Sequence, residues 1–229
     1  TIMAGSTGPD IVTDGLVLAV DAANKKSYPG SGTAWNDLSG NNTNGTLTNG
    51  PVFDGGNAGT IDFDGTNDYI SFPSNIFSTL TSITISCWFY WTNNEQWTRI
   101  FDFGVSTSVY MFLTPRSSLN KPRFAIRAPS LSEQIINAPS AISTNVWSNI
   151  VITLNGTTGI MYMDGVSIQS NSISSTPDDL GNTTNNWIGK SQFSDPYYTG
   201  NIANVTIYNK ALSAAEILQN YNATKNRFI

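Results

Sequence analysis

Four side chains in polar segments of the sequence are of types that recognise sugars or protein surfaces. They are Trp97 in "NNEQWTR", Arg116 in "TPRSSLN", and Tyr197 and Tyr198 in "FSDPYYTG". Aromatic rings stack on sugar rings, and arginine donates hydrogen bonds to hydroxyl groups. Pro196 stiffens the loop that carries the tyrosine pair. Neighbours in an extended loop point opposite ways, so we expect only one tyrosine to contact a partner.

Other aromatic and basic residues have a plainer interpretation. Trp187 in "TTNNWIG" precedes a predicted strand and is expected to pack in the core. Arg123 and Arg127 flank "FAI" and share one face of a strand, where they either line a sheet surface or are solvated. Solvation is the interpretation we favour for this arginine pair.

The sequence offers little for catalysis. It contains no histidine, so the usual general base, triad member and zinc ligand are missing. Glycoside hydrolysis needs two carboxylates that lie close together. None of the three glutamates, Glu95, Glu133 and Glu216, has another acidic residue close to it in the sequence. Asp62 and Asp64 alternate in "IDFDG", but the Asp64-Gly65 pair is typical of a turn, which is the interpretation we favour over catalysis. We therefore predict no catalytic residue and a protein that is not an enzyme.

Composition excludes several classes of function. The chain of 229 residues is 39% hydrophobic but only 12% charged, with a net charge of −5, so it can bury a core but has no basic stripe for nucleic acid. No apolar run is long enough to span a membrane. Cys87 has no partner for an internal disulfide. The opening "TIMAGSTGPDIV" is unlike a signal peptide, and its first residue, Thr1, leads us to expect missing or processed residues upstream.

Turn signals divide the chain into short strands. Seven Asn-Gly or Asp-Gly pairs separate β-rich runs such as "LVLAV", "SITISCWFYW", "SVYMFLT" and "NVTIYN". Such spacing predicts an all-β sandwich or barrel. The stretch "LNGTTGIMYMDGVSI", 154–168, has two hairpin turns and apolar residues on both faces, and so predicts scaffold. Ser213 and Glu216 form a capping box that begins one short helix over about 213–224.

Four segments together resemble a known family. They are "GTIDFDGTNDYISFP", "SITISCWFYW", "VWSNIVITLNGTTGIMYMDGVSI" and "YTGNIANVTIYNKALSAAEILQNY". In this order they resemble the laminin-G-like and pentraxin-like domains of the concanavalin A-like lectin/glucanase superfamily. The resemblance implies a jelly-roll sandwich of two antiparallel sheets over 15–229, preceded by an N-terminal extension over 1–14. It also implies that "LVLAV" pairs with "NVTIYN", and that Trp35 and Trp147 fill packing positions.

The calcium site of pentraxins is not matched. Its acidic cluster corresponds here to Ser191, Gln192 and Phe193, which lack the carboxylates that calcium prefers. We predict no metal site of that type and no cofactor. A structural ion elsewhere, for example at Asp62, Asp64 or Asp68, stays open as an alternative.

A second, narrower resemblance concerns the two ends of the chain. The opening "GPDIVTDGLVLAVDAANKKSYPGSGTAWNDLSGNN" and the ending "ALSAAEILQNYNATKNRF" are similar to segments of virion proteins of tailed bacteriophages. We therefore expect a non-catalytic adhesion or decoration module on a virion surface, which binds glycan or a neighbouring virion protein. Its own copies are a further candidate partner, in a homo-oligomer. The alternatives are a glycan-active hydrolase on the same fold and a purely structural block that packs against its own copies.

Overall fold

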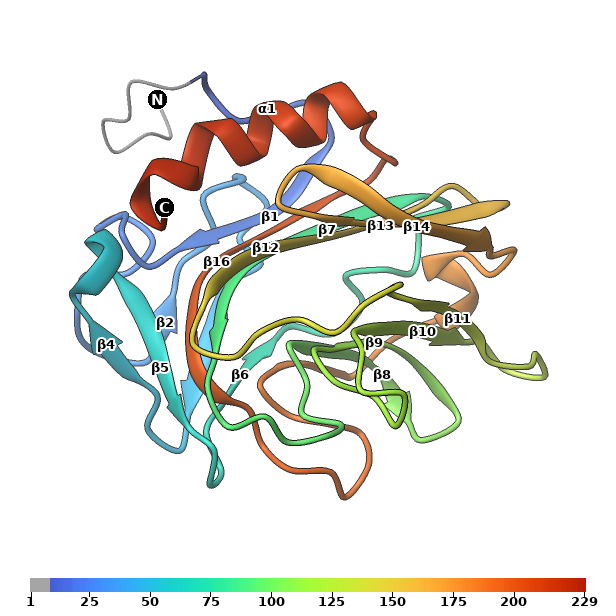
Figure 1. Cartoon of the computed structure of the whole chain (residues 1–229), viewed down its shortest axis with the longest axis horizontal. Coiled ribbons are helices and arrows are strands. Elements are labelled where there is room, and N and C mark those ends of the chain that lie inside the picture. Colours follow the sequence, from blue (N-terminus) through green and yellow to red (C-terminus); the bar gives the residue numbers. More distant parts are fainter. Residues whose placement is uncertain (1–8) are drawn as a thin grey trace.

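The short strands pair into two antiparallel sheets that lie face to face (Figure 1). This computed structural model describes residues 9–229. The all-β sandwich expected from the sequence is confirmed, and residues 1–8 of the expected N-terminal extension lie outside the described residues. Sheet A has the strand order β14 (Val166–Ser172), β13 (Thr158–Met163), β12 (Trp147–Leu154), β7 (Ile83–Trp91), β16 (Thr199–Tyr208), β5 (Thr60–Asp64), β4 (Val52–Asp54), and β1 (Leu16–Asp21) also pairs with β16.

Sheet B forms the second layer. Its strand order is β11 (Gln134–Asn137), β10 (Arg123–Arg127), β9 (Val109–Thr114), β8 (Phe101–Ser106), β15 (Asn185–Ile188), β6 (Tyr69–Phe72), β3 (Gly45–Thr48), β2 (Ala34–Trp35). The described chain also has three short 3-10 helices. η1 (Gly56–Ala58) and η2 (Pro177–Leu180) lie between strands, and η3 (Lys225–Arg227) follows α1. The expected pairing of "LVLAV" with "NVTIYN" is confirmed, because β1 runs antiparallel to β16.

The core lies between the sheets and follows the alternation of the strands. In β7, Ile85, Cys87 and Phe89 are buried in it, together with Phe103 and Met111 from sheet B. A strand places alternate side chains on opposite faces. Sheet B therefore turns the remaining residues of β8, β9 and β10 away from the core, and this outer face carries the features described below.

One helix covers the outer face of sheet A, as Figure 1 shows. Helix α1 (Ala214–Thr224) begins at the N-cap Ser213, whose hydroxyl accepts the backbone N–H of Glu216, so the capping box is confirmed. Trp88 on β7 stacks against Tyr221 of the helix, with ring centroids 5.6 Å apart. Its indole Nε1 donates to Thr224 Oγ1 at 2.8 Å. The apolar outer side of β7 is thus explained by the helix that packs on it.

The two hairpins of the 154–168 stretch are scaffold, as expected. Gly156 and the pair Asp164-Gly165 adopt positive φ values of 83°, 51° and 80°, which tight hairpin turns require. Met161 is buried in the main core, and Tyr162 is buried on the other side beneath α1. Apolar residues on both faces of β13 therefore serve packing on both faces.

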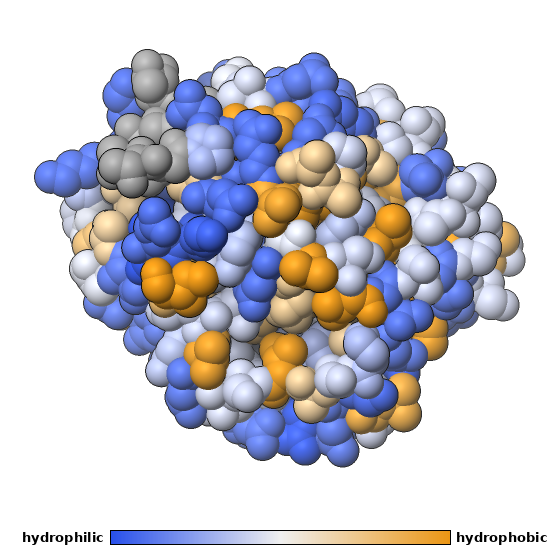
Figure 2. Space-filling view, turned by 45° about the horizontal axis from the view of Figure 1, so that its top comes forward, coloured by the Kyte–Doolittle hydropathy of each residue, from blue (hydrophilic) through white to orange (hydrophobic). Residues whose placement is uncertain are grey.

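The face of the molecule seen in Figure 2 is mostly polar. In Figure 2, apolar side chains lie in small groups among polar ones rather than in one continuous patch. Among the helices of the described residues, none is long and apolar enough to cross a membrane.

Candidate functional site

Sheet B presents an aromatic cluster on its outer face. Tyr110 and Phe112 of β9 and Ala125 of β10 alternate with core residues and therefore point outward. The rings of Tyr110 and Phe112 are stacked, with centroids 5.5 Å apart. Trp97, from the loop before β8, meets Phe112 edge to face at 6.4 Å.

A pocket of about 270 Å³ opens over this cluster. We call it the aromatic pocket. Its floor and rim combine four aromatic rings with two arginines and two carboxylates, a composition that suits a polyhydroxylated ligand. The lining residues are Trp97, Arg99, Tyr110, Phe112, Arg123, Glu133, Phe193 and Asp195.

Trp97 reaches the pocket from an unusual backbone conformation. Its φ is 66°, in the left-handed region that a bulky residue avoids at a cost of about 1–2 kcal/mol. Hydrogen bonds hold both sides of the residue, since Trp97 N donates to Arg116 O at 2.8 Å and Arg99 Nη1 donates to Trp97 O. Strain of this kind persists only where the surroundings enforce it, and it concentrates at functional sites.

Arg99 organises the floor of the aromatic pocket. The side chain is 2% exposed, and its Cζ lies 4.0 Å from the centre of the Phe112 ring. Its Nη2 donates to Asp195 at 2.7 Å, and its Nε lies 3.3 Å from Asp102 Oδ2. Arg99 thereby ties the Trp97 loop, β8 and the loop before β16 together.

Asp102 lies behind Arg99 with no exposed surface. Burial raises the pKa of this carboxyl to about 7, although the Arg99 guanidinium and the backbone N–H of Gln192 oppose the shift. The Gln192 N–H donates to Asp102 Oδ2 at 3.0 Å. The charge state of Asp102 is thus linked to the position of the loop that carries Phe193 and Asp195.

The rim of the aromatic pocket supplies the polar contacts. Tyr110 donates its hydroxyl to Glu133 Oε1 at 2.7 Å, and Phe193, 36% exposed, meets Tyr110 edge to face. Arg123 donates from Nε to Asn137 Oδ1 at 2.8 Å, and its Cζ lies 5.4 Å from the Trp97 ring centre. Among the described residues, none accepts a hydrogen bond from the two Nη groups of Arg123. These groups are placed to donate to a ligand.

The predicted residue Arg116 acts on the loop rather than in the aromatic pocket. Its Nε and Nη2 donate to Asn120 Oδ1 at 3.0 and 2.8 Å, and its Nη1 donates to the carbonyl of Asn94. It lines a separate cavity of about 120 Å³ beside Trp91. Its guanidinium and its backbone carbonyl therefore fix the loop that positions Trp97.

The tyrosine pair divides as the alternation of an extended loop requires, and Tyr198 is ruled out as a contact for a partner. Its side chain is fully buried, with the hydroxyl donating to Tyr90 O at 2.9 Å and the ring edge-on to Phe63. Tyr197 remains half-exposed and does not line the aromatic pocket. Of the four predicted contacts, only Trp97 lies in this pocket, and Arg116 supports it.

The structure also bears on the predictions made for other residues. Trp187 is half-exposed on the outer face of sheet B instead of packing in the core, and it contacts Tyr69. Trp147 is half-buried against Tyr90, while Trp35 is fully buried as expected. Arg123 lines the aromatic pocket and is not merely solvated. Arg99 and Phe193 were not predicted at all.

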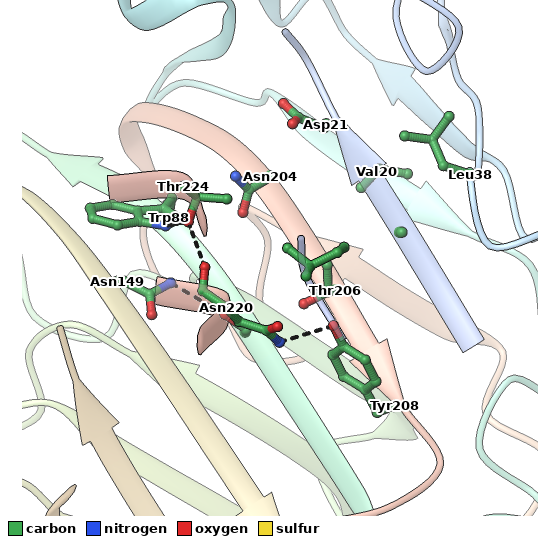
Figure 3. Close-up of a pocket in the computed structure, with 13 residues that line it drawn as sticks. Val20, Asp21, Leu38, Trp88, Asn149, Asn204, Thr206, Tyr208, Asn220 and Thr224 are labelled. Atoms are coloured by element: carbon green, nitrogen blue, oxygen red, sulfur yellow. Dashed lines mark hydrogen bonds between the residues drawn. The ribbon is translucent and has the colours of Figure 1, made fainter. Parts of the chain in front are cut away.

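A third, smaller cavity lies beneath α1 (Figure 3). It holds about 60 Å³ between the helix and sheet A, and both apolar side chains and uncharged polar ones line it. Asn220 Nδ2 donates to the Tyr208 hydroxyl at 3.0 Å, whereas the buried Asn204 Nδ2 has no partner among the described residues. This volume exceeds the roughly 10–15 Å³ that one water needs, and the polar side chains in its lining suit ordered water under the helix.

The acidic turn considered for an ion is held by the protein itself. Asp64 Oδ1 accepts the backbone N–H of Thr66 at 2.7 Å, and Asp68 Oδ2 accepts that of Asp64 at 3.2 Å. Within residues 9–229, no group of three or more acidic, histidine or cysteine side chains is placed to hold a metal ion. The pattern in "IDFDG" is therefore the end of strand β5 and the start of the turn that follows it.

Comparison with protein families bears on the fold. The family model described as the concanavalin A-like lectin/glucanases superfamily, a laminin-G type, matches residues 64–218. The chain belongs to this superfamily. The resemblance drawn from the four sequence segments is confirmed at this level. A search of curated proteins found no matching sequence.

Solved structures of the same fold come from several larger proteins. Domain 4 of AbnA, an extracellular arabinanase from Geobacillus stearothermophilus solved with arabinotriose, has a TM-score of 0.76 and 16% identity, covering 90% of this chain and 98% of that one. The binding domain of botulinum neurotoxin DC in complex with SialylT has a TM-score of 0.70 and 16% identity, covering 93% and 52%. Trypanosoma rangeli sialidase has a TM-score of 0.68 and 15% identity, covering 93% and 33%. This chain thus spans about half of the toxin domain and a third of the sialidase.

Proposed function

We propose that this protein is a non-catalytic carbohydrate-binding module whose ligand occupies the aromatic pocket. The observation that carries the proposal is the juxtaposition of Trp97, held in a strained backbone, with Arg123 and Glu133 at one rim. A sugar has apolar C–H faces and polar hydroxyl groups, so it needs a ring for stacking beside hydrogen-bond donors and acceptors. The aromatic pocket offers both.

The size of the aromatic pocket favours binding of a single sugar residue inside it, with the rest of the glycan lying over the rim. Its volume of about 270 Å³ is slightly below the roughly 300–1,000 Å³ of typical small-molecule sites. Two rings of the pocket lining, Phe193 and Trp97, are then available to contact the neighbouring sugar residues of the glycan. The expected ligand is therefore a terminal or branching sugar of a glycan.

The charged groups of the aromatic pocket support binding rather than hydrolysis. A glycosidase needs one carboxylic acid that donates a proton and a second carboxylate that acts as base or nucleophile. Here Asp195 is ion-paired with Arg99, and Glu133 accepts the hydroxyl of Tyr110. Neither carboxylate stands free over the ligand space, and the chain has no histidine to replace them.

Relatives of the same fold supply independent support. The arabinanase domain was solved with arabinotriose and the neurotoxin domain with SialylT, so domains of this architecture were studied with saccharides. Their identity to this chain is about 16%, which is too low to assign any of their binding residues to positions in this chain. The proposal for the aromatic pocket therefore rests on its own geometry.

A glycan array followed by calorimetry tests the proposal. The parent protein is expected to bind at least one oligosaccharide, and Trp97→Ala to weaken that binding by about 1–3 kcal/mol, or 5- to 150-fold. Trp147→Ala is the matched control, because Trp147 is also half-buried but lies on sheet A. Equal affinities for the parent and Trp97→Ala would refute the site.

The same ligand also tests the non-catalytic part of the proposal. Incubation with the parent protein should leave oligosaccharide length unchanged. Shortened chains that disappear with Glu133→Gln would instead make the protein a glycan-active hydrolase.

We further propose that the module is displayed on the surface of a phage particle, where it binds a host glycan. The supporting observations are the low content of charged residues and the similarity of both chain ends to virion segments. Proteomics of purified particles is the test, and particles that lack the protein would contradict it. Binding of a neighbouring virion protein or of its own copies, with no sugar bound, would favour a structural block.

A further inference from the structure

A second aromatic cluster lies on the outer face of sheet B. Tyr69 of β6 and Trp187 of β15 meet edge to face, with ring centroids 6.2 Å apart. The Nζ of Lys190 lies 4.2 Å from the centre of each ring. All three side chains are half-exposed. We call these residues the Trp187 platform.

The Trp187 platform and the aromatic pocket are separated by a loop. Trp187 pairs with Asp102 across the β15–β8 ladder, and the Gln192 backbone crosses over Asp102 through its hydrogen bond to Oδ2. Phe193, on the far side of this crossing, lines the aromatic pocket. The two clusters therefore flank the loop that follows Lys190, and one ligand residue cannot occupy both.

Lys190 carries an uncompensated charge. It forms no ion pair with any described residue, whereas other basic side chains such as Arg99, Lys210 and Arg227 do. The two rings hold its ammonium group by cation–π attraction, which limits its freedom without neutralising its charge. A charge that is already positioned loses little further entropy when it binds an anion.

Hydroxyl groups line the side of the Trp187 platform formed by β6 and β3. Ser71 pairs with Trp187 and with Thr46 in neighbouring strands, and Thr48 pairs with Tyr69. Because Ile70 and Phe72 point into the core, Tyr69 and Ser71 point outward. The surface thus joins an ammonium group, two ring edges and a row of hydroxyls.

We propose that the Trp187 platform is a second saccharide site that binds an anionic sugar residue. Lys190 contacts the carboxylate or sulfate of that residue, and the exposed parts of the Trp187 and Tyr69 rings contact its C–H groups. The site is selective for acidic sugars because its single charged group is a cation, whereas the aromatic pocket contains charges of both signs. Its existence does not depend on a ligand in the aromatic pocket.

Nuclear magnetic resonance of the tryptophan indoles, combined with titration calorimetry, tests this inference. The probes are an oligogalacturonate for the carboxylate, a sulfated galactose oligomer for the sulfate, and a neutral galactose oligomer of equal length. At least one acidic probe is expected to shift the Trp187 indole signal, which is assigned from its loss in Trp187→Phe. Tenfold weaker binding is expected in Lys190→Gln, and added salt should weaken binding by the parent protein.

Three comparisons keep the outcome decisive. Lys190→Arg should retain most of the acidic binding, and Lys25→Gln, at an exposed lysine, should change nothing. Trp97→Ala should leave binding of the acidic probe unchanged, so that failure of the aromatic pocket and failure of the Trp187 platform are distinguishable. The inference is overturned if neither acidic probe binds, if Lys190→Gln binds like the parent, or if Trp97→Ala alone abolishes acidic binding.

Discussion

The backbone of Trp97 leads to a prediction in which glycine is a better replacement than alanine. Alanine removes the ring but keeps a Cβ at a φ of 66°, whereas glycine removes both. A non-glycine residue in this region costs about 1–2 kcal/mol, and the greater freedom of glycine in the unfolded chain offsets about 0.5–1 kcal/mol of the gain. We therefore expect Trp97→Gly to be more stable than Trp97→Ala by about 0.5–1 kcal/mol.

Both variants should be less stable than the parent protein. Truncating a buried tryptophan to alanine costs about 3–5 kcal/mol, and the half-buried ring of Trp97, which packs on Phe112 and Arg123, should cost about half of that. Both should lose binding to the same extent, because neither supplies a ring. The pair separates the stability of the loop from the recognition of the ligand.

The assay is urea denaturation of the three proteins, followed by calorimetry with the sugar selected on the array. If the free energy of unfolding falls with urea concentration at the same slope in all three proteins, their free energies of unfolding can be compared directly. The reasoning about the backbone is refuted if Trp97→Ala is as stable as Trp97→Gly or more so. The reasoning about the ring is refuted if either variant binds like the parent.

Three further predictions concern the supports of the aromatic pocket. Arg116→Ala should weaken sugar binding up to about tenfold by loosening the Trp97 loop, and Arg116→Lys should not restore it, because an ammonium group lacks the fork of donors; calorimetry of both variants checks this. Burial raises the pKa of Asp102 from 3.8 to about 7 in the folded protein, so folding takes up a proton between pH 4 and 7. The contribution of Asp102 to the free energy of unfolding is therefore lost as the pH rises through that window, by up to about 1.4 kcal/mol per pH unit. Denaturation at several pH values should show this slope in the parent and not in Asp102→Asn, and equal slopes would contradict the shift. Tyr198→Phe should lower the free energy of unfolding by about 1 kcal/mol, because the hydroxyl bond to a backbone carbonyl is lost, whereas Tyr197→Phe should not change the melting temperature.

Much of the fold could be predicted because the sequence signals are local. The turn pairs Asn155-Gly156 and Asp164-Gly165 mark their hairpins, and the capping box at Ser213 marks the start of α1. Strands such as β11 and β14 were not among the predicted runs. β14 is largely exposed and polar, so its place is set by pairing with β13 and not by an apolar pattern.

The candidate site could be predicted only in part. Trp97 was found because it is a large ring in a polar loop, and the alternation of "SVYMFLT" could have placed Tyr110 and Phe112 on one face. Arg99 carries no such signal, because its ion pair with Asp195 joins residues 96 positions apart. Trp187 was expected in the core because a tryptophan beside a strand usually packs there; only the sheet pairing shows which face it occupies.

A crystal structure of the protein with the neutral oligosaccharide that binds most tightly on the array tests the central claim most directly. We predict a sugar ring against Trp97 in the aromatic pocket, with hydroxyl groups bonded to the Nη groups of Arg123 and to Glu133. A sugar bound away from this pocket, with Trp97 and Arg123 free of contact, would contradict the account.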